Sequence, residues 1–243
     1  MLNLGGSMSR PFFETSLDVS KYSMSFDGTT DYINFTETSI PIGTEGDDGS
    51  ITFWAKRTDN NDEAVILGNS ATGSYKRLYF DDDGDRLYIE SDQNGQDAYA
   101  PVTADTNWHY YVITWVGAAG GSTATVKMYE DGNLLEVTNT NFGAQHDKFF
   151  TVNRIGDDNA AGDQAFKGLL YQVSIWTKAL TASMVTQTYN SGTPIPLQEA
   201  SKIGSSKITH LWRFAEGTGS TTEDSIGRLN GTIVNATWSS TTP

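Results

Sequence analysis

Short runs of alternating apolar and polar residues, each bounded by turn-forming residues, restrict the fold of this chain more than any other feature. Successive side chains of a β-strand point to opposite faces, so an alternating run buries one face and exposes the other. Such runs are rich in β-branched and aromatic residues and cover residues 50–55, 86–90, 108–115, 125–129 and 169–176. Long helical periodicity is nearly absent. The pattern predicts an all-β sandwich or barrel.

The residues between these runs are typical of β-hairpins. Asp131-Gly132 lies between two runs and predicts a type I′ turn with both central residues at positive φ. The acidic stretch 81–85 is interpreted as a second hairpin rather than as a calcium-binding loop between helices, because alternating strands flank it. One short helix is predicted over residues 181–189, with Thr181 as its N-cap and Gly192 as its stop.

Charge and composition exclude several classes of partner and site. The chain has 16 basic and 30 acidic residues, a net charge of −14, which repels phosphate backbones and anionic membrane surfaces. We therefore expect no nucleic-acid partner and no membrane partner. The absence of cysteine excludes a disulfide framework and thiolate chemistry. No apolar run approaches the roughly 20 residues that cross a bilayer, and the N-terminus lacks the pattern of a secretory signal.

The chain divides into four parts by pattern. Residues 1–21 are interpreted as an extended N-terminal arm, residues 22–189 as the strand-rich body, and residues 190–206 as a linker. Residues 207–243 are expected to complete the same sandwich.

The last of these parts contains one strongly apolar strand. Strand alternation places Ile208, His210, Trp212 and Phe214 on one face, and that face needs a sheet to cover it. Pairing within the same chain is the first prediction, and pairing with a neighbouring copy is the alternative.

The order of the strand motifs resembles a known family. Together the motifs resemble the laminin G-like, concanavalin A-like jelly rolls of bacteria and phages, which implies two antiparallel sheets stacked face to face. That family serves mostly in carbohydrate binding or adhesion, and some relatives are glycoside hydrolases. The motifs, in order, are Ser25–Ile33, Ser50–Trp54, Asn107–Trp115, Lys127–Gly132, Arg154–Asp157, Phe166–Gly168 with Val173–Trp176, and Lys178–Thr181.

A second resemblance lies at the C-terminal end. Residues 210–219, continuing to residue 232, look like the segment that ordinarily opens such a domain, yet here they come last. This order is similar to that of marine phage proteins, which favours a virion protein.

The resemblance does not extend to a catalytic site. Hydrolases of this fold carry carboxylates two residues apart on one strand, facing the substrate. The nearest match is Glu90 with Asp92, but Asn94 stands where the third carboxylate is required. We therefore predict that the chain is not an enzyme. His109, between aromatic residues of one run, is interpreted as a hydrogen-bonded structural residue.

Calcium is the metal that the residue types allow, because cysteine is absent and histidine is scarce. The family resemblance points to the loop that contains Asp224 and Asn230 as a source of oxygen ligands. A further acidic cluster contains Asp157 and Asp158. Solvated acidic loops without an ion are the alternative for both clusters.

Glycan binding needs an aromatic ring for the sugar face and amides or carboxylates for the hydroxyls. Tyr75, Tyr88 and Tyr99 lie among polar residues that include Asn94, and these four are the predicted glycan-binding residues. The tryptophans of the strand runs are assigned to the core.

The predicted function is a non-enzymatic structural or adhesive protein on the surface of a virion, of the tailed-phage kind. Its predicted partners are other virion proteins or copies of itself, contacted through the arm, and surface glycans. The alternative is an extracellular, secreted bacterial carbohydrate-binding module or an accessory domain of a glycoside hydrolase.

Overall fold

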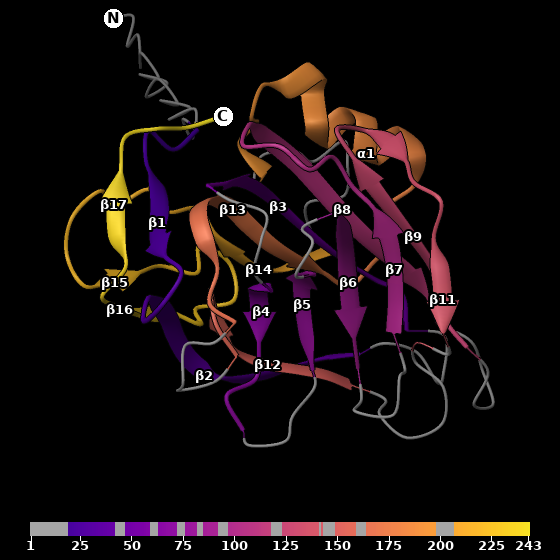
Figure 1. Cartoon of the computed structure of the whole chain (residues 1–243), viewed down its shortest axis with the longest axis horizontal. Helices are drawn as coiled ribbons and strands as arrows, with labels where there is room; N and C mark the ends of the chain where they lie inside the picture. The colour runs from indigo at the N-terminus through magenta and orange to yellow at the C-terminus, as the bar shows by residue number, and fades with distance from the viewer. Residues whose placement is uncertain are drawn as a thin grey trace, which may run out of the picture.

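The chain folds into two antiparallel sheets that pack face to face, as the computed structural model shows (Figure 1). The prediction of an all-β jelly-roll sandwich is confirmed. The structure describes residues 19–41, 47–58, 63–71, 76–81, 85–91, 97–117, 123–140, 142, 149–158, 164–197 and 207–243. Residues 1–18 of the predicted arm, and the predicted site residues Tyr75 and Asn94, lie outside these ranges.

Sheet A contains eight of the described strands. In spatial order they are β10 (Asn133–Leu134), β9 (Thr125–Glu130), β8 (Trp108–Val116), β3 (Gly49–Arg57), β13 (Lys167–Trp176), β1 (Ser23–Asp27) and β17 (Thr237–Ser239), and β14 (Ile208–Trp212) also pairs with β13.

Sheet B contains nine described strands. In spatial order they are β11 (Thr138–Thr140), β7 (Asp97–Pro101), β6 (Arg86–Glu90), β5 (Arg77–Phe80), β4 (Ala64–Gly68), β12 (Phe149–Ile155), β2 (Tyr32–Pro41), β16 (Gly231–Val234) and β15 (Thr221–Thr222).

The main core lies between the two sheets and follows the alternation in the sequence. On β8, Tyr111, Ile113 and Trp115 point inward and are at most 1% exposed. They meet the inward side chains of sheet B, such as Phe80 of β5 and Leu87 of β6. Each fully buried side chain of this size stabilises the fold by about 1.5–3 kcal/mol, so the interior strongly specifies the strand register.

A second apolar cluster covers the outer face of sheet A. The alternate residues Tyr110 and Val112 of β8 point outward and pack with Trp54 beneath the helix α1 (Ala182–Tyr189). The helix begins as predicted, because the Thr181 hydroxyl accepts the Met184 N–H. It ends at Asn190 in the left-handed conformation.

The predicted linker begins with ordered, packed residues. A 3₁₀ turn (η2, Asn190–Gly192) follows α1, and Leu197 is 1% exposed within the outer cluster. The side-chain amide of Gln172 donates to the Ile195 carbonyl at 3.1 Å. Residues 190–197 therefore belong to the body, because their apolar side chains complete the cover on sheet A.

The C-terminal segment takes part in both sheets of the same chain. β14 and β1 lie along the same edge of β13, β17 extends sheet A beyond β1, and β16 pairs with β2 in sheet B. Trp212 and Phe214 enter the main core.

The predicted face of Ile208 is wrong. The pairing of β13 with β14 shifts register between Ile175 and Trp176, so Ile208 joins Leu211 in the outer cluster instead. This bulge adds one residue to β14, so the side chains that precede it point to the opposite faces from those that strict alternation predicts.

The hairpin turn between β9 and β10 has the predicted geometry. Asp131 and Gly132 have φ values of 49° and 80°, which confirms the type I′ turn. Within the described ranges, no helix combines the length and the apolar character that crossing a membrane requires.

Candidate functional site

Three tyrosines form a row on the outer face of sheet B. Tyr79 of β5 is directly opposite Tyr88 of β6, and Tyr88 is directly opposite Tyr99 of β7. Their ring centroids are 5.1 Å and 4.6 Å apart, with interplanar angles of 18° and 24°. Two of the four predicted glycan-binding residues, Tyr88 and Tyr99, are therefore neighbours.

The rings in this tyrosine row stack on one another rather than lying flat on the sheet. Both faces of Tyr88 are covered, one by Tyr79 and the other by Tyr99. The sequence had suggested a flat ring that stacks on a sugar. The structure gives instead an aromatic edge, since cross-strand pairing sets the rings upright and side by side. Tyr88 also hydrogen-bonds to Arg86, which lies at the solvent side of the row.

A charged cluster adjoins the tyrosine row on the same face. The Arg77 guanidinium is 4.2 Å from the Tyr79 ring centroid and donates to Glu90 at 3.0 Å and to Glu63 at 2.9 Å. Burial raises the pKa of Glu90, while Arg77 opposes this shift. The sequence analysis missed Arg77. The sequence does contain a pattern that could have identified it: Arg-Leu-Tyr occurs at residues 77–79 of β5 and again at residues 86–88 of β6.

The acidic residues Asp157 and Asp158 lie over the same face, beside two arginines. Gly68 of β4 allows this, because a Cβ there would be 2.5 Å from the Asp158 Cβ. Arg154 donates to Asp157 at 2.9 Å, and Arg77 is 3.7 Å from Asp158.

Asp158 is the more perturbed of the two acids. Burial raises its pKa to about 6 although Arg77 opposes the shift. Its Oδ1 atom and the Nε atom of Arg154 are buried without a hydrogen-bond partner in the described part of the chain. The face thus combines stacked tyrosines with guanidinium and carboxylate groups, a set that recognises hydroxyl-rich ligands.

The other predicted metal ligands, Asp224 and Asn230, stabilise a turn. Asp224 Oδ2 is 2.7 Å from His210 Nδ1 and accepts the Leu229 N–H at 3.0 Å. Asp224 Oδ1 accepts the N–H groups of Leu211, Ile226 and Gly227. Asn230 contributes one bond, accepting the Asp224 N–H. Burial alone would raise the pKa of Asp224, but these bonds together lower it.

The predicted calcium ligands have other partners in the structure. The oxygens of Asp224 are engaged by N–H donors, and Asp157 and Asp158 lie beside the positive charges of Arg154 and Arg77. Among the described residues, no three acidic or histidine side chains are grouped as metal ligands. Calcium binding stays a prediction.

The predicted structural role of His109 is confirmed. Its Nδ1 atom is 2.7 Å from Asp131 Oδ2, and its Nε2 atom is 3.0 Å from Asp105 Oδ1. These two carboxylates raise the pKa of His109 to about 9, the hydrogen bond with Asp131 being the largest cause and burial opposing it. The imidazolium therefore joins β8 to two neighbouring loops.

Comparison with known proteins assigns the family. Residues 27–186 match the model of a family described as the concanavalin A-like lectin/glucanase superfamily. No curated protein matches the chain at a significant level.

Two solved structures share the fold. The first is a protein from Bacteroides ovatus described as carbohydrate binding; it is 18% identical, with a TM-score of 0.62, and the match covers 92% of this chain and 60% of that one. This chain thus spans less than two thirds of that protein. The second is a heptameric pentraxin from Limulus polyphemus, 18% identical with a TM-score of 0.53, matched over 72% of this chain and 84% of that one.

Proposed function

Because the chain belongs to the concanavalin A-like lectin/glucanase superfamily, we propose that it is a non-catalytic module that binds glycans. One observation carries this proposal: the outer face of sheet B presents the tyrosine row beside the Arg77 cluster. In the described part of the chain, α1 packs on sheet A and no helix packs on these strands. Tyr79 and Arg77 are buried, whereas Tyr88 and Tyr99 are partly exposed, so these two rings are the part of the row that a ligand can reach.

The chemistry of this face fits binding better than hydrolysis. Glu90 is the described member of the predicted carboxylate pair, and it forms an ion pair with Arg77. The guanidinium occupies the Glu90 carboxylate by a hydrogen bond and an ion pair, so this carboxylate serves a structural contact within the face. Asp92 and Asn94 lie outside the described residues. The carbohydrate-binding description of the Bacteroides neighbour adds support.

Display on a virion surface stays a prediction. Contact with virion proteins through the arm also stays one, since residues 1–18 of the arm lie outside the described residues. The comparisons support the alternative in its carbohydrate-binding part. Both locations agree with glycan binding.

A glycan array tests the proposal directly. The wild-type protein is screened first, and the affinity of the strongest ligand is then measured for Tyr88→Ala and Tyr99→Ala. We expect each substitution to weaken binding about tenfold, because each removes an aromatic edge and a hydroxyl from the row. Tyr22→Ala is the control, since Tyr22 is 37% exposed next to sheet A. Equal affinities for all four proteins, or release of reducing sugar from the ligand, would contradict the proposal.

A further inference from the structure

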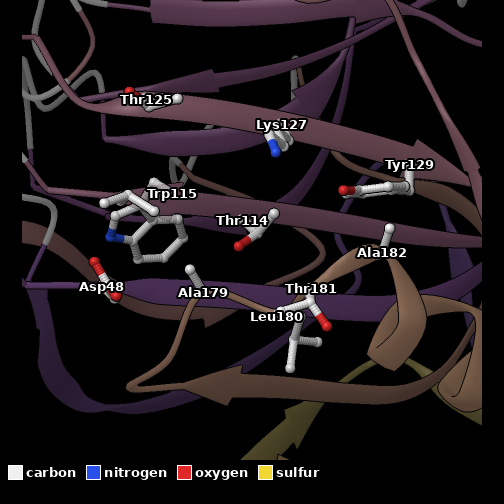
Figure 2. Close-up of a pocket in the computed structure, with 11 residues that line it drawn as sticks. Asp48, Thr114, Trp115, Thr125, Lys127, Tyr129, Ala179, Leu180, Thr181 and Ala182 are labelled. Carbon is white, nitrogen blue, oxygen red and sulfur yellow. The ribbon is translucent and has the colours of Figure 1, made fainter.

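A pocket of about 400 Å³ lies on the outer face of sheet A, opposite the tyrosine row (Figure 2). Strands β8 and β9 form its floor, and the segment from Ala179 to Ala182 forms one wall. Its volume falls in the lower part of the range of small-molecule sites, which is about 300–1,000 Å³.

The pocket exists because the cover on sheet A is incomplete. The Ser50 hydroxyl donates to the Lys178 carbonyl at 2.8 Å and accepts the Leu180 N–H at 3.0 Å. These bonds hold the segment before α1 against β3. The helix then starts at Ala182 and covers the Tyr110–Val112 side of the sheet. The part of the sheet around Thr125 and Lys127, which are exposed, lies beyond this cover.

Polar groups from two strands converge on this space. Lys127 and Tyr129 are two residues apart on β9, so they share a face, and Thr114 of β8 is directly opposite Lys127. Figure 2 shows the ends of these three side chains directed toward the same space. Thr114 donates to the Gly49 carbonyl at 3.3 Å, so its oxygen is free to accept a hydrogen bond.

Two of these groups have no partner in the described part of the chain. Tyr129 is 2% exposed, and its hydroxyl makes no hydrogen bond with any described residue. Lys127 likewise has no ion-pair partner among the described residues, although the chain carries a net charge of −14. The Tyr129 hydroxyl and the exposed Lys127 ammonium are therefore hydrogen-bond donors that an acceptor in the pocket can contact together.

The helix end adds to the positive potential. The first turn of α1 contains no acidic residue, and Thr181 and Ala182 line the pocket. The start of a helix attracts anions. Asp48 is the acidic residue of the lining, and Figure 2 places it beside Trp115, away from Lys127. The pocket therefore has a positive end and a hydrogen-bond-accepting end.

We propose that this pocket binds a sugar acid, a compact ligand with one carboxylate and several hydroxyls. The carboxylate contacts Lys127 and accepts a hydrogen bond from the Tyr129 hydroxyl, while the ligand's hydroxyls donate to Thr114 and Asp48. The site lies on the other face of the sandwich from the tyrosine row, so it does not depend on the function proposed above.

Calorimetric titration with D-glucuronate, and with D-glucose as the neutral analogue, tests this site. We expect glucuronate to bind at least tenfold more tightly than glucose. Lys127→Gln should weaken glucuronate binding at least tenfold, and Tyr129→Phe about threefold to fivefold. Lys207→Gln is the matched control, because it removes the same charge from an exposed position outside the pocket. Lys127 is also exposed, so its substitution should leave the fold intact, and thermal melts verify this.

Three results would overturn the proposal: no glucuronate binding by the wild-type protein, equal binding of glucose and glucuronate, or unchanged binding by Lys127→Gln. Tyr88→Ala separates the two faces. The Tyr88→Ala protein should bind glucuronate as tightly as the wild type does, even if it no longer binds the glycan found on the array. Loss of glucuronate binding in Tyr88→Ala would place the sugar acid on sheet B and would also overturn the pocket.

Discussion

Replacement of His109 by glutamine should destabilise the protein in a pH-dependent way. Both ring nitrogens of His109 contact carboxylates, Asp131 at 2.7 Å and Asp105 at 3.0 Å, and Glu130 is 3.8 Å away. Both nitrogens serve as donors only in the protonated ring. Its side chain is 14% exposed, so solvent screens these contacts only in part.

The pKa shift sets the size of the effect. The pKa of His109 rises from 6.5 to about 9, and about 1.4 kcal/mol per pKa unit gives an upper limit of about 3.5 kcal/mol. Solvent screening and the exposed side of Asp105 reduce this, so we expect about 2 kcal/mol. A raised pKa in the folded state stabilises the protein fully below 6.5, and that contribution is lost as the pH rises through about 9.

Urea unfolding followed by tryptophan fluorescence at pH 6, 7.5, 9 and 10 measures this effect. We expect His109→Gln to be less stable than the wild type by about 2 kcal/mol at pH 6 and by less than about 0.5 kcal/mol at pH 10. In a double-mutant cycle, Asp105→Asn should overlap with His109→Gln rather than add to it. A difference that stays constant from pH 6 to pH 10 would refute the reasoning, since it would reflect packing alone.

Two further predictions concern the C-terminal segment. Asp224→Asn should lower the free energy of unfolding by about 3 kcal/mol at pH 7, as measured in urea, because it weakens charge-assisted bonds from His210 and several N–H groups. Since the pKa of Asp224 is lowered in the folded protein, this stabilisation is lost as the pH falls below 3.8. An unchanged urea midpoint for the variant would contradict this prediction. Truncation after Ala200 should yield an insoluble or molten body, because it removes Trp212 and Phe214 from the core. A truncated protein that is soluble, monomeric and melts cooperatively would show that the segment is dispensable.

The sequence predicted the elements that depend on local pattern. The runs at 50–55, 86–90 and 108–115 all lie within observed strands, and Asp131-Gly132 forms the predicted turn. Alternation and turn chemistry are local properties, so they can be read from neighbouring residues alone. The face of Ile208 was assigned wrongly because a bulge depends on the partner strand, which local alternation does not encode.

The candidate site was harder to predict because its residues meet across strands. Tyr88 and Tyr99 were identified as polar-region aromatics, but their stacking depends on the register of β6 against β7. Arg77 and Arg154 were missed, because each is a single charged residue within a strand. Their roles depend on hydrogen bonds to Glu90 and Asp157, which the folded structure brings beside them. The hydrogen bonds of Asp224 could not be predicted, because sequence spacing does not show which N–H groups converge on a carboxylate.

The difference between the two outer faces has a simple origin in the sequence. The outward positions of sheet A include Trp54, Tyr110 and Val112, and such a face must be covered to be stable in water. The connection after β13 supplies that cover directly, as α1 and residues 190–197. The outward positions of sheet B include Tyr88, which is partly exposed, and Arg77, which is buried but paired with Glu63 and Glu90, so this face needs no apolar cover. The composition of alternate strand positions thus determines which face the helix covers and which face stays polar.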